Sequence, residues 1–133
     1  MERSNELTEL VHTIYDAVSC GDADALKGML SARQGVVFIG TDPDEVYFDA
    51  ASITAMLQGQ ADAGIKVRAG TVTAFEEGTV GWTADTGTFV LPDGTDVPFR
   101  MTAVFHRENG AWKLVQEHAS IAVTNEEAIG AEL

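Results

Sequence analysis

The sequence predicts an α+β domain in which helices precede a mainly antiparallel sheet. In the first half of the chain, apolar residues recur at the three- and four-residue spacing of amphipathic helices. From residue 65 to 123, β-branched and aromatic residues are broken by short turn signals, as in a meander of strands. The chain has 133 residues, 45% of them hydrophobic, which suffices for one packed core. No linker, repeat or low-complexity segment divides it, so residues 1–133 should form a single domain.

Three helices are expected before residue 65. The first covers about residues 5–20, after the possible cap Ser4 and before Gly21, which ends it. Asp22 caps a short second helix, and the third covers about residues 50–63. The remaining expected segments are a strand at residues 36–39, a turn at residues 41–45 and a capped helical turn at residues 124–128.

Four long antiparallel strands should form the sheet, and the lengths of the turns between them decide which side chains share a face. We predict a two-residue turn at residues 93–94 and a three-residue loop at residues 108–110. The resulting cross-strand pairs include Trp82 with Phe105, and Met101 with Glu117. One face then carries apolar residues, with small ones at its centre, around the carboxyl group of Glu117.

This apolar face is expected to form the wall of a pocket for a small apolar organic molecule. Its small side chains leave volume between the larger ones. The residues that we expect to contact the ligand are Trp82, Thr86, Met101, Ala103, Phe105 and Ala119. Aromatic residues also fill ordinary cores, so the pairing of Trp82 with Phe105 is compatible with plain packing as well.

The opposite face combines large apolar side chains with polar ones, a mixture that suits a protein interface better than bulk solvent. Its apolar strip consists of Val104, Trp112 and Leu114. Such a strip is too large to be left in contact with water. We therefore expect a homodimer whose two subunits meet through this face.

Glu117 is the strongest catalytic candidate, because it is the ionisable residue in the middle of the apolar face. Desolvation raises the pKa of a carboxyl group and makes it a general acid or base near neutral pH. Tyr15, on a helix that would face the sheet, is a candidate second hydrogen-bond donor. The alternative is a Glu117 side chain that is solvated or paired with an arginine.

Asp42 is a second candidate for the general base. Since it precedes Pro43, it is also typical of a turn in which the aspartate caps its own backbone.

His106 and His118 lie too far apart in the predicted register to share a metal ion, and we expect structural roles for them. With a single cysteine, Cys20, no disulfide is possible within the chain. We expect no metal and no cofactor.

The composition also excludes several classes of function. With 8 basic and 21 acidic residues the net charge is −13, which disfavours binding to nucleic acid or to an anionic membrane surface. No apolar run is long enough for a transmembrane helix or a secretory signal, so a cytoplasmic location is expected. The glycines lack the spacing of a phosphate-binding or dinucleotide-binding loop.

Several short motifs occur in an order that is typical of one fold family. They are Gly21-Asp22 after the first helix, Asp42-Pro43 before the third, residues 102–105 leading to Asn109-Gly110 and Trp112, and His118-Ala119-Ser120 near the end. In this respect the sequence resembles the nuclear transport factor 2-like superfamily, in particular its SnoaL-like members. The resemblance implies a cone-shaped fold, with three N-terminal helices packed on a curved sheet. It also implies a pocket on the concave face and a homodimer formed through the convex face.

The superfamily contains steroid isomerases, polyketide cyclases, dehydratases and non-catalytic modules such as the association domain of calcium/calmodulin-dependent kinase II, so fold does not settle function. Asp42 falls where an Asp-Pro pair supplies the general base of the isomerases, and the kinase domain carries the same pair. The isomerase tyrosine matches Ile14, next to Tyr15, and two pocket arginines of the kinase domain match Ala103 and Ala119. If the protein is an enzyme, the resemblance implies isomerisation, cyclisation or dehydration by carboxylate acid–base chemistry. The alternative is a non-catalytic module for ligand binding or oligomerisation.

Overall fold

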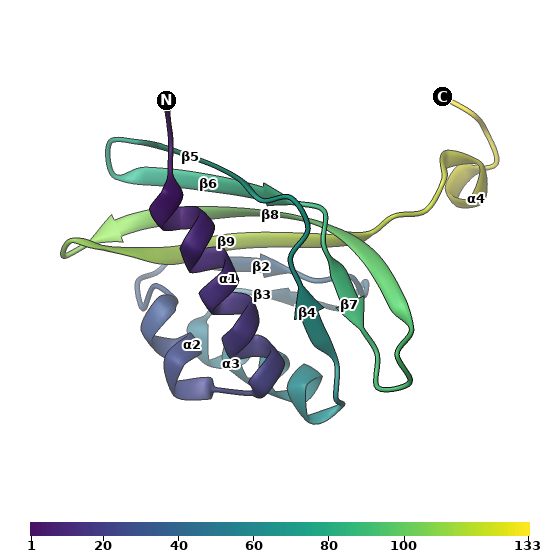
Figure 1. Ribbon diagram of the computed structural model, residues 1–133, viewed down its shortest axis with the longest axis horizontal. Coiled ribbons are helices and arrows are strands. Elements are labelled where there is room, and N and C mark those ends of the chain that lie inside the picture. Colours follow the sequence, from purple (N-terminus) through teal and green to yellow (C-terminus); the bar gives the residue numbers. More distant parts are fainter.

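The computed structural model describes residues 1–133 and confirms the α+β class, with helices packed on an open, mostly antiparallel sheet (Figure 1). The expected N-terminal helices are α1 (Asn5–Cys20), α2 (Ala23–Met29) and α3 (Ala50–Asp62), and a fourth, α4 (Asn125–Ile129), follows the sheet. The strands are β1 (Glu2–Arg3), β2 (Val37–Ile39), β3 (Val46–Tyr47), β4 (Lys66–Arg68), β5 (Thr73–Glu77), β6 (Val80–Asp85), β7 (Thr88–Val90), β8 (Asp96–Glu108) and β9 (Ala111–Ile121). No helix has both the length and the apolar character needed to span a membrane.

The main path of the sheet runs in the order β1-β5-β6-β8-β9-β2-β3, and only the pair of β2 with β9 is parallel. The long strand β8 pairs with β6 over one part and with β7 over another, and β7 also pairs with β4. Helices α1, α2 and α3 gather on one side of this sheet (Figure 1). We call the face that packs on these helices the inner face and the opposite one the outer face. The hydrophobic core fills the space between the helices and the inner face.

Both ends of α1 follow local signals in the sequence. The Ser4 side chain accepts a hydrogen bond of 3.2 Å from the backbone N–H of Leu7, and Gly21 closes the helix with a φ of 70°. The apolar side of α1 is buried against the sheet, and Tyr15 lies on this side with 6% of its surface exposed. The N-terminal cap therefore fixes the phase of the helix that brings Tyr15 to the inner face.

The predicted four long strands are wrong, because the segment is divided into the six strands β4 to β9. The chain leaves the ladder at Gly70, between β4 and β5, and again at Gly87, between β6 and β7. At Gly87 a Cβ atom would lie 2.4 Å from the ring of Phe99 and 2.6 Å from the carbonyl oxygen of Arg68. Only glycine allows the backbone to approach its neighbours this closely, and the strands end where it does so.

The register predicted for the first hairpin is wrong by one residue. The backbone N–H of Leu91 donates to the carbonyl oxygen of Thr95 at 2.9 Å, which leaves a three-residue loop whose last member, Gly94, has a φ of 87°. The observed pairs include Trp82 with Val104, and Thr83 with Ala103. A shift of one residue exchanges the two faces of a strand, so β6 turns Trp82 outward and Thr83 inward.

The second hairpin differs from its prediction in two ways. Each shifts the register by one residue, so together they return the side chains of the second half of β9 to the predicted face. Asn109 and Gly110, with φ values of 52° and 81°, form a two-residue turn instead of a three-residue loop. A β-bulge in the middle of β8 and β9 then shifts the register by one further residue. Beyond the bulge Glu117 lies opposite Ala103, on the inner face where the sequence places it, although its partner is not the predicted Met101.

Between the turn and the bulge the faces are reversed, which corrects the predicted interface strip. Trp112 and Leu114 point inward and are only 7% and 3% exposed. The guanidinium group of Arg107 lies 4.1 Å from the centre of the Trp112 ring and covers its edge of the core. Of the three predicted strip residues, only Val104 remains on the outer face. The reason is the two-residue turn, whose length sets the parity of the first part of β9.

Candidate functional site

An apolar cavity lies between the helices and the inner face of the sheet. Its empty volume, with its open mouth included, is about 660 Å³, and 14 of its 19 lining residues are hydrophobic. A smaller space of about 260 Å³ continues toward the middle of the sheet. The walls include Ile14, Tyr15, Phe38, Met56, Leu57, Phe89, Met101, Leu114, Glu117 and Ala119. Tyr15, Met101 and Glu117 line both spaces and therefore mark the centre of the site.

Glu117 is the acidic group at this centre. It lies on β9 between Ala103 of β8 and Phe38 of β2, which are its neighbours across the sheet. Part of its surface stays open, but that surface faces the apolar cavity instead of bulk solvent. No hydrogen bond or ion pair of the structure involves its carboxyl group. Burial among apolar groups accordingly raises the pKa of Glu117 from 4.5 to about 7.

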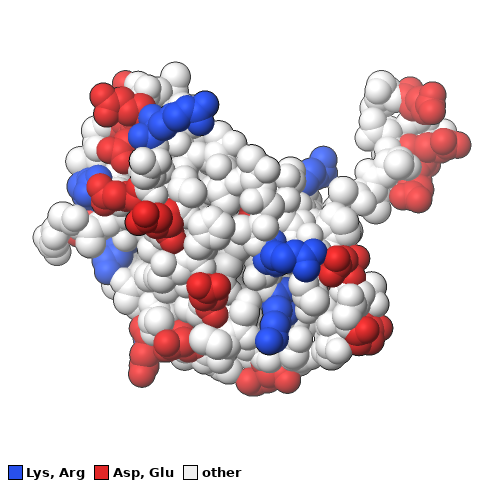
Figure 2. Space-filling view, viewed as in Figure 1, with Lys and Arg blue, Asp and Glu red and all other residues white.

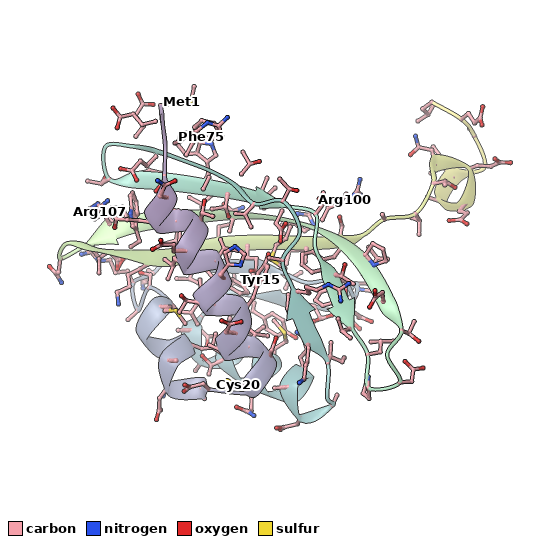
Figure 3. The ribbon with its side chains drawn as sticks, viewed as in Figure 1. Met1, Tyr15, Cys20, Phe75, Arg100 and Arg107 are labelled. Atoms are coloured by element: carbon pink, nitrogen blue, oxygen red, sulfur yellow. The ribbon has the colours of Figure 1, made fainter.

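Tyr15 and Asp85 form the second polar feature of the site. The Tyr15 hydroxyl donates a hydrogen bond of 3.1 Å to Oδ2 of Asp85, and it lies 3.5 Å from the sulfur of Met101. Figure 3 labels Tyr15 on the part of α1 that crosses the sheet. Burial, followed by the negative charges of Asp85 and Glu117, raises the pKa of Tyr15 far above its ordinary value of 10.0. Tyr15 therefore stays a neutral phenol. Its hydroxyl donates its proton to Asp85, and its oxygen can accept a hydrogen bond.

Asp85 is held in a tight backbone niche. Its carboxylate also accepts a hydrogen bond of 3.1 Å from the backbone N–H of Gly70, and its residue is only 5% exposed. A Cβ atom on Gly70 would lie 1.9 Å from the carbonyl oxygen of Thr86. A Cβ atom on Gly87 would lie 3.0 Å from the Asp85 carboxylate itself. Two glycines thus let the backbone close around Asp85, and Asp85 in turn fixes the hydroxyl group of Tyr15.

The charge of the cavity has one sign. Its charged lining residues are Glu117 and, near Gly40 and Thr41, Glu45, whereas no lysine, arginine or histidine lines it. The nearest polar companions of Glu45 are in its own turn, where its Oε1 atom accepts a hydrogen bond of 3.0 Å from the backbone N–H of Asp42. No group of three histidine, cysteine, aspartate or glutamate side chains is arranged to hold a metal ion. The cavity is therefore an apolar space with acidic groups and no cationic one.

Most of the site residues predicted from the sequence come together here. Met101 and Ala119 line the main cavity, and Ala103 and Phe105 line the inner extension. Tyr15 and Glu117 lie between the two spaces. On β9, Glu117 and Ala119 agree with the prediction because the shorter turn and the bulge together shift the register by two residues, which returns these side chains to the predicted face.

Three predicted site residues lie elsewhere. Trp82 is on the outer face and Thr86 is exposed, because the first hairpin is shifted by one residue. Asp42 is exposed in a turn outside the cavity lining, where its Oδ1 atom accepts a hydrogen bond of 3.1 Å from the backbone N–H of Asp44. This is the turn-capping arrangement that competed with the catalytic interpretation.

Asp85 is the residue of the candidate site that the sequence analysis missed. The predicted register put it on the face away from the helices, among solvent-exposed or interface residues. The signal that could have found it is the run Pro92-Asp93-Gly94, since a glycine in the third loop position favours a three-residue loop over a two-residue turn. That loop length places Asp85 inward.

Comparison with known families gives the same architecture. Residues 7–124 match the profile of the SnoaL-like domain, which is most of the chain. The protein belongs to the SnoaL-like family. No curated protein matches the sequence.

Solved structures with the same fold share little sequence with this SnoaL-like protein. An NTF2-like protein of unknown function from Pseudomonas putida KT2440 superposes with a TM-score of 0.78 at 16% identity, over 92% of this chain and 88% of the other. A Xanthomonas campestris protein, provisionally named a calcium/calmodulin-dependent protein kinase II association domain, gives 0.74 at 18% identity over 92% and 95%. A Streptomyces avermitilis protein, provisionally named a dehydratase of the NTF2-like family, gives 0.75 at 19% identity over 88% and 94%. At these identities the likeness shows the fold alone.

Proposed function

We propose that this SnoaL-like protein binds a small, mostly apolar organic molecule in its cavity and that Glu117 transfers a proton to or from it. The observation that carries the proposal is the unpaired carboxyl group of Glu117 at the centre of an apolar cavity. With a pKa of about 7, both of its protonation states are populated at neutral pH, which is the condition for general acid–base catalysis.

The proposed chemistry uses Glu117 twice. Its carboxylate takes a proton from a carbon atom next to a carbonyl group of the ligand, and the carboxylic acid so formed returns the proton. Return to a different carbon atom gives isomerisation, and delivery to a leaving hydroxyl group gives dehydration. The Tyr15 hydroxyl borders the same space and, because its only proton is donated to Asp85, it accepts a hydrogen bond from a hydroxyl group at the polar end of the ligand. One structural neighbour bears a provisional dehydratase name, which supports a reaction of this class.

The lining also limits the charge of the ligand. An anionic ligand would meet Glu117 and Glu45 without any cation to balance its charge in a medium of low dielectric constant. A neutral ligand meets no such cost. We therefore propose a neutral ligand, with methionines such as Met56 and Met101 adapting the narrow walls to its shape.

Two matched probes test the charge of the ligand. 2-Naphthylmethanol should bind the wild type at least about tenfold more tightly than 2-naphthoate at pH 8, because the carboxylate is repelled by ionised Glu117. Titration calorimetry measures both affinities. The preference should shrink in Glu117→Gln and persist in Glu9→Gln, which removes the same charge from an exposed site on α1. Equal affinities for the two probes in the wild type would contradict the proposed ligand class.

Proton transfer is tested with 2-tetralone, a neutral bicyclic ketone with acidic C–H bonds. In deuterium oxide the wild type should exchange these protons about 100-fold faster than Glu117→Gln does, with the exchange followed by nuclear magnetic resonance. Glu9→Gln should behave as the wild type. Binding of the ketone with equal exchange rates in all three proteins would reject catalysis and favour the non-catalytic binding module.

We also propose that two copies of the chain pair through the outer face, with a strip that differs from the sequence prediction. Phe75, Trp82 and Val104 form a continuous cross-strand row there and are only half-buried in one copy. At tens of micromolar the wild type should sediment as a dimer, and Trp82→Asp should sediment as a monomer. Phe48→Asp, which changes an exposed aromatic residue outside this row, is the control. A monomeric wild type would remove the pairing.

A further inference from the structure

The C-terminal segment, residues 122–133, stands apart from the rest of the chain. Every residue in it is exposed, and all the hydrogen bonds of α4 are made within the segment. Figure 1 shows it leaving the end of β9 and projecting away from the sheet and the other helices. Its conformation rests on contacts within the segment alone, and its acidic side chains lie clear of the body of the protein (Figure 2).

The segment nevertheless has a defined structure and the chemistry of a docking element. Thr124 and Glu127 form a reciprocal capping box, and Gly130 closes α4 with a φ of 72°. A helix of five residues is marginal in water by itself, and packing against another surface would stabilise it. Val123 and Ile129 are 58% and 62% exposed, which leaves apolar surface for such packing. Three acidic residues accompany them, namely Glu126, Glu127 and Glu132.

A mostly polar groove lies on the outer face of the sheet. It is open, with an empty volume of about 1050 Å³, and its lining includes Thr73, Thr102, Ser120, Arg100 and His118. Arg100 is exposed and takes part in no ion pair, although the chain has 21 acidic residues for 8 basic ones. Asp85 also borders the groove, but its carboxylate is buried toward the inner side, where it is hydrogen-bonded to Tyr15 and Gly70. The groove thus offers a free cation and several hydroxyl groups to an acidic partner.

We propose that the C-terminal segment of one copy lies in the outer groove of a second copy, with Glu126 and Glu127 against Arg100. This rests on the proposed pairing through the outer face. Arg100 lies directly opposite Ser120, at the end of the sheet from which the segment departs, as Figure 3 shows for the Arg100 label. Strand β9 carries the segment off the end of its own sheet, and the segment projects away from that sheet (Figure 1). When two outer faces meet around a twofold axis, each segment can reach the groove of the other copy.

The charge complementarity is tested by reversal. Arg100→Glu, and separately Glu126→Lys with Glu127→Lys, should each raise the dimer dissociation constant about tenfold, and the three changes together should restore it. Lys66→Glu is the matched control, because Lys66 is exposed and lies outside the groove. Sedimentation equilibrium at low salt measures all five proteins. Additive weakening in the combined variant would overturn the proposal.

Chemical cross-linking decides which copy the segment occupies. Arg100→Lys keeps the charge and provides an amine that a carbodiimide joins to a carboxylate in contact with it. In a mixture of nitrogen-15-labelled and unlabelled chains, the cross-linked peptides should include labelled–unlabelled pairs joining the introduced lysine to Glu126 or Glu127. Glu126→Gln with Glu127→Gln is the control and should give no such peptides.

The possible results separate this inference from the pairing on which it rests. A dimer that gives no cross-link, or cross-links only within chains of one label, retains the pairing and overturns the exchange of C-terminal segments. A monomeric wild type overturns both. A dimer with mixed-label cross-links and restored affinity on charge reversal supports the exchange.

Discussion

Glu117→Gln should remove a pH dependence of about 3 kcal/mol from the free energy of unfolding. Burial raises the pKa of Glu117 from 4.5 to about 7, and each unit of pKa corresponds to about 1.36 kcal/mol. Glutamine has nearly the same shape and does not titrate. The variant should therefore become more stable relative to the wild type as the pH rises.

The sign follows from which state holds the proton. In the folded protein Glu117 keeps its proton up to about pH 7, whereas in the unfolded chain it loses it near pH 4.5. The stabilisation of the neutral form is thus complete below about pH 4.5, declines as the pH rises, and is lost once the pH passes about 7. Above that pH a carboxylate without a counter-ion is buried in the cavity, which destabilises the wild type.

Urea unfolding of both proteins at intervals from pH 4 to pH 9 measures the effect. The difference between them should change by about 3 kcal/mol over this range and level off above pH 7. Glu9→Gln controls for the loss of one negative charge from a highly acidic chain, and its difference from the wild type should stay nearly constant. If the difference in free energy of unfolding between Glu117→Gln and the wild type does not change with pH, the Glu117 carboxyl group is solvated. The cavity would then be without its acid–base group.

The helices could be predicted in detail because their ends depend on nearby residues. Ser4, Gly21 and Asp22 act through hydrogen bonds and backbone angles within a few positions of themselves. The register of the sheet could not be predicted in this way. Its register depends on turns that differ by one residue in length, and a sequence such as Asp93-Gly94 is compatible with both lengths. An error of one residue moves every side chain of a strand to the other face but leaves the strand itself in place. The predicted fold class is therefore correct, whereas the predicted interface strip is not.

Errors in the predicted strand register also decide which residues of the candidate site could be predicted. Glu117 was placed on the inner face by a loop that is one residue too long, and the structure reaches the same face through a shorter turn and a bulge. Asp85 had no comparable compensation, because nothing in the β6 and β8 hairpin offsets the shift. Its burial also depends on Gly70, 15 positions away, whose N–H group supplies a hydrogen bond. Long-range backbone contacts of this kind leave no periodic trace in a sequence.

The niche around Asp85 should make Gly70→Ala one of the most damaging small substitutions in this protein. A Cβ atom at this position would lie 1.9 Å from the carbonyl oxygen of Thr86, so the backbone of one segment must move. That movement also disturbs the hydrogen bond from the Gly70 N–H group to Asp85 and, through it, the position of Tyr15. We expect a loss of about 3 kcal/mol, from overpacking and a weakened hydrogen bond to a buried carboxylate.

Gly59→Ala is the matched control, since it adds the same methyl group within α3, where nothing beyond the adjacent residues and the helix's own backbone lies within 4 Å. It should stabilise the protein by up to about 1 kcal/mol through helix propensity. Thermal and urea unfolding of the two variants at pH 7 measure the contrast. A cost below about 1 kcal/mol for Gly70→Ala would show that the loop between β4 and β5 yields easily. Asp85 would then be held loosely, and the fixed Tyr15 hydroxyl on which the proposed orientation of the ligand depends would be lost.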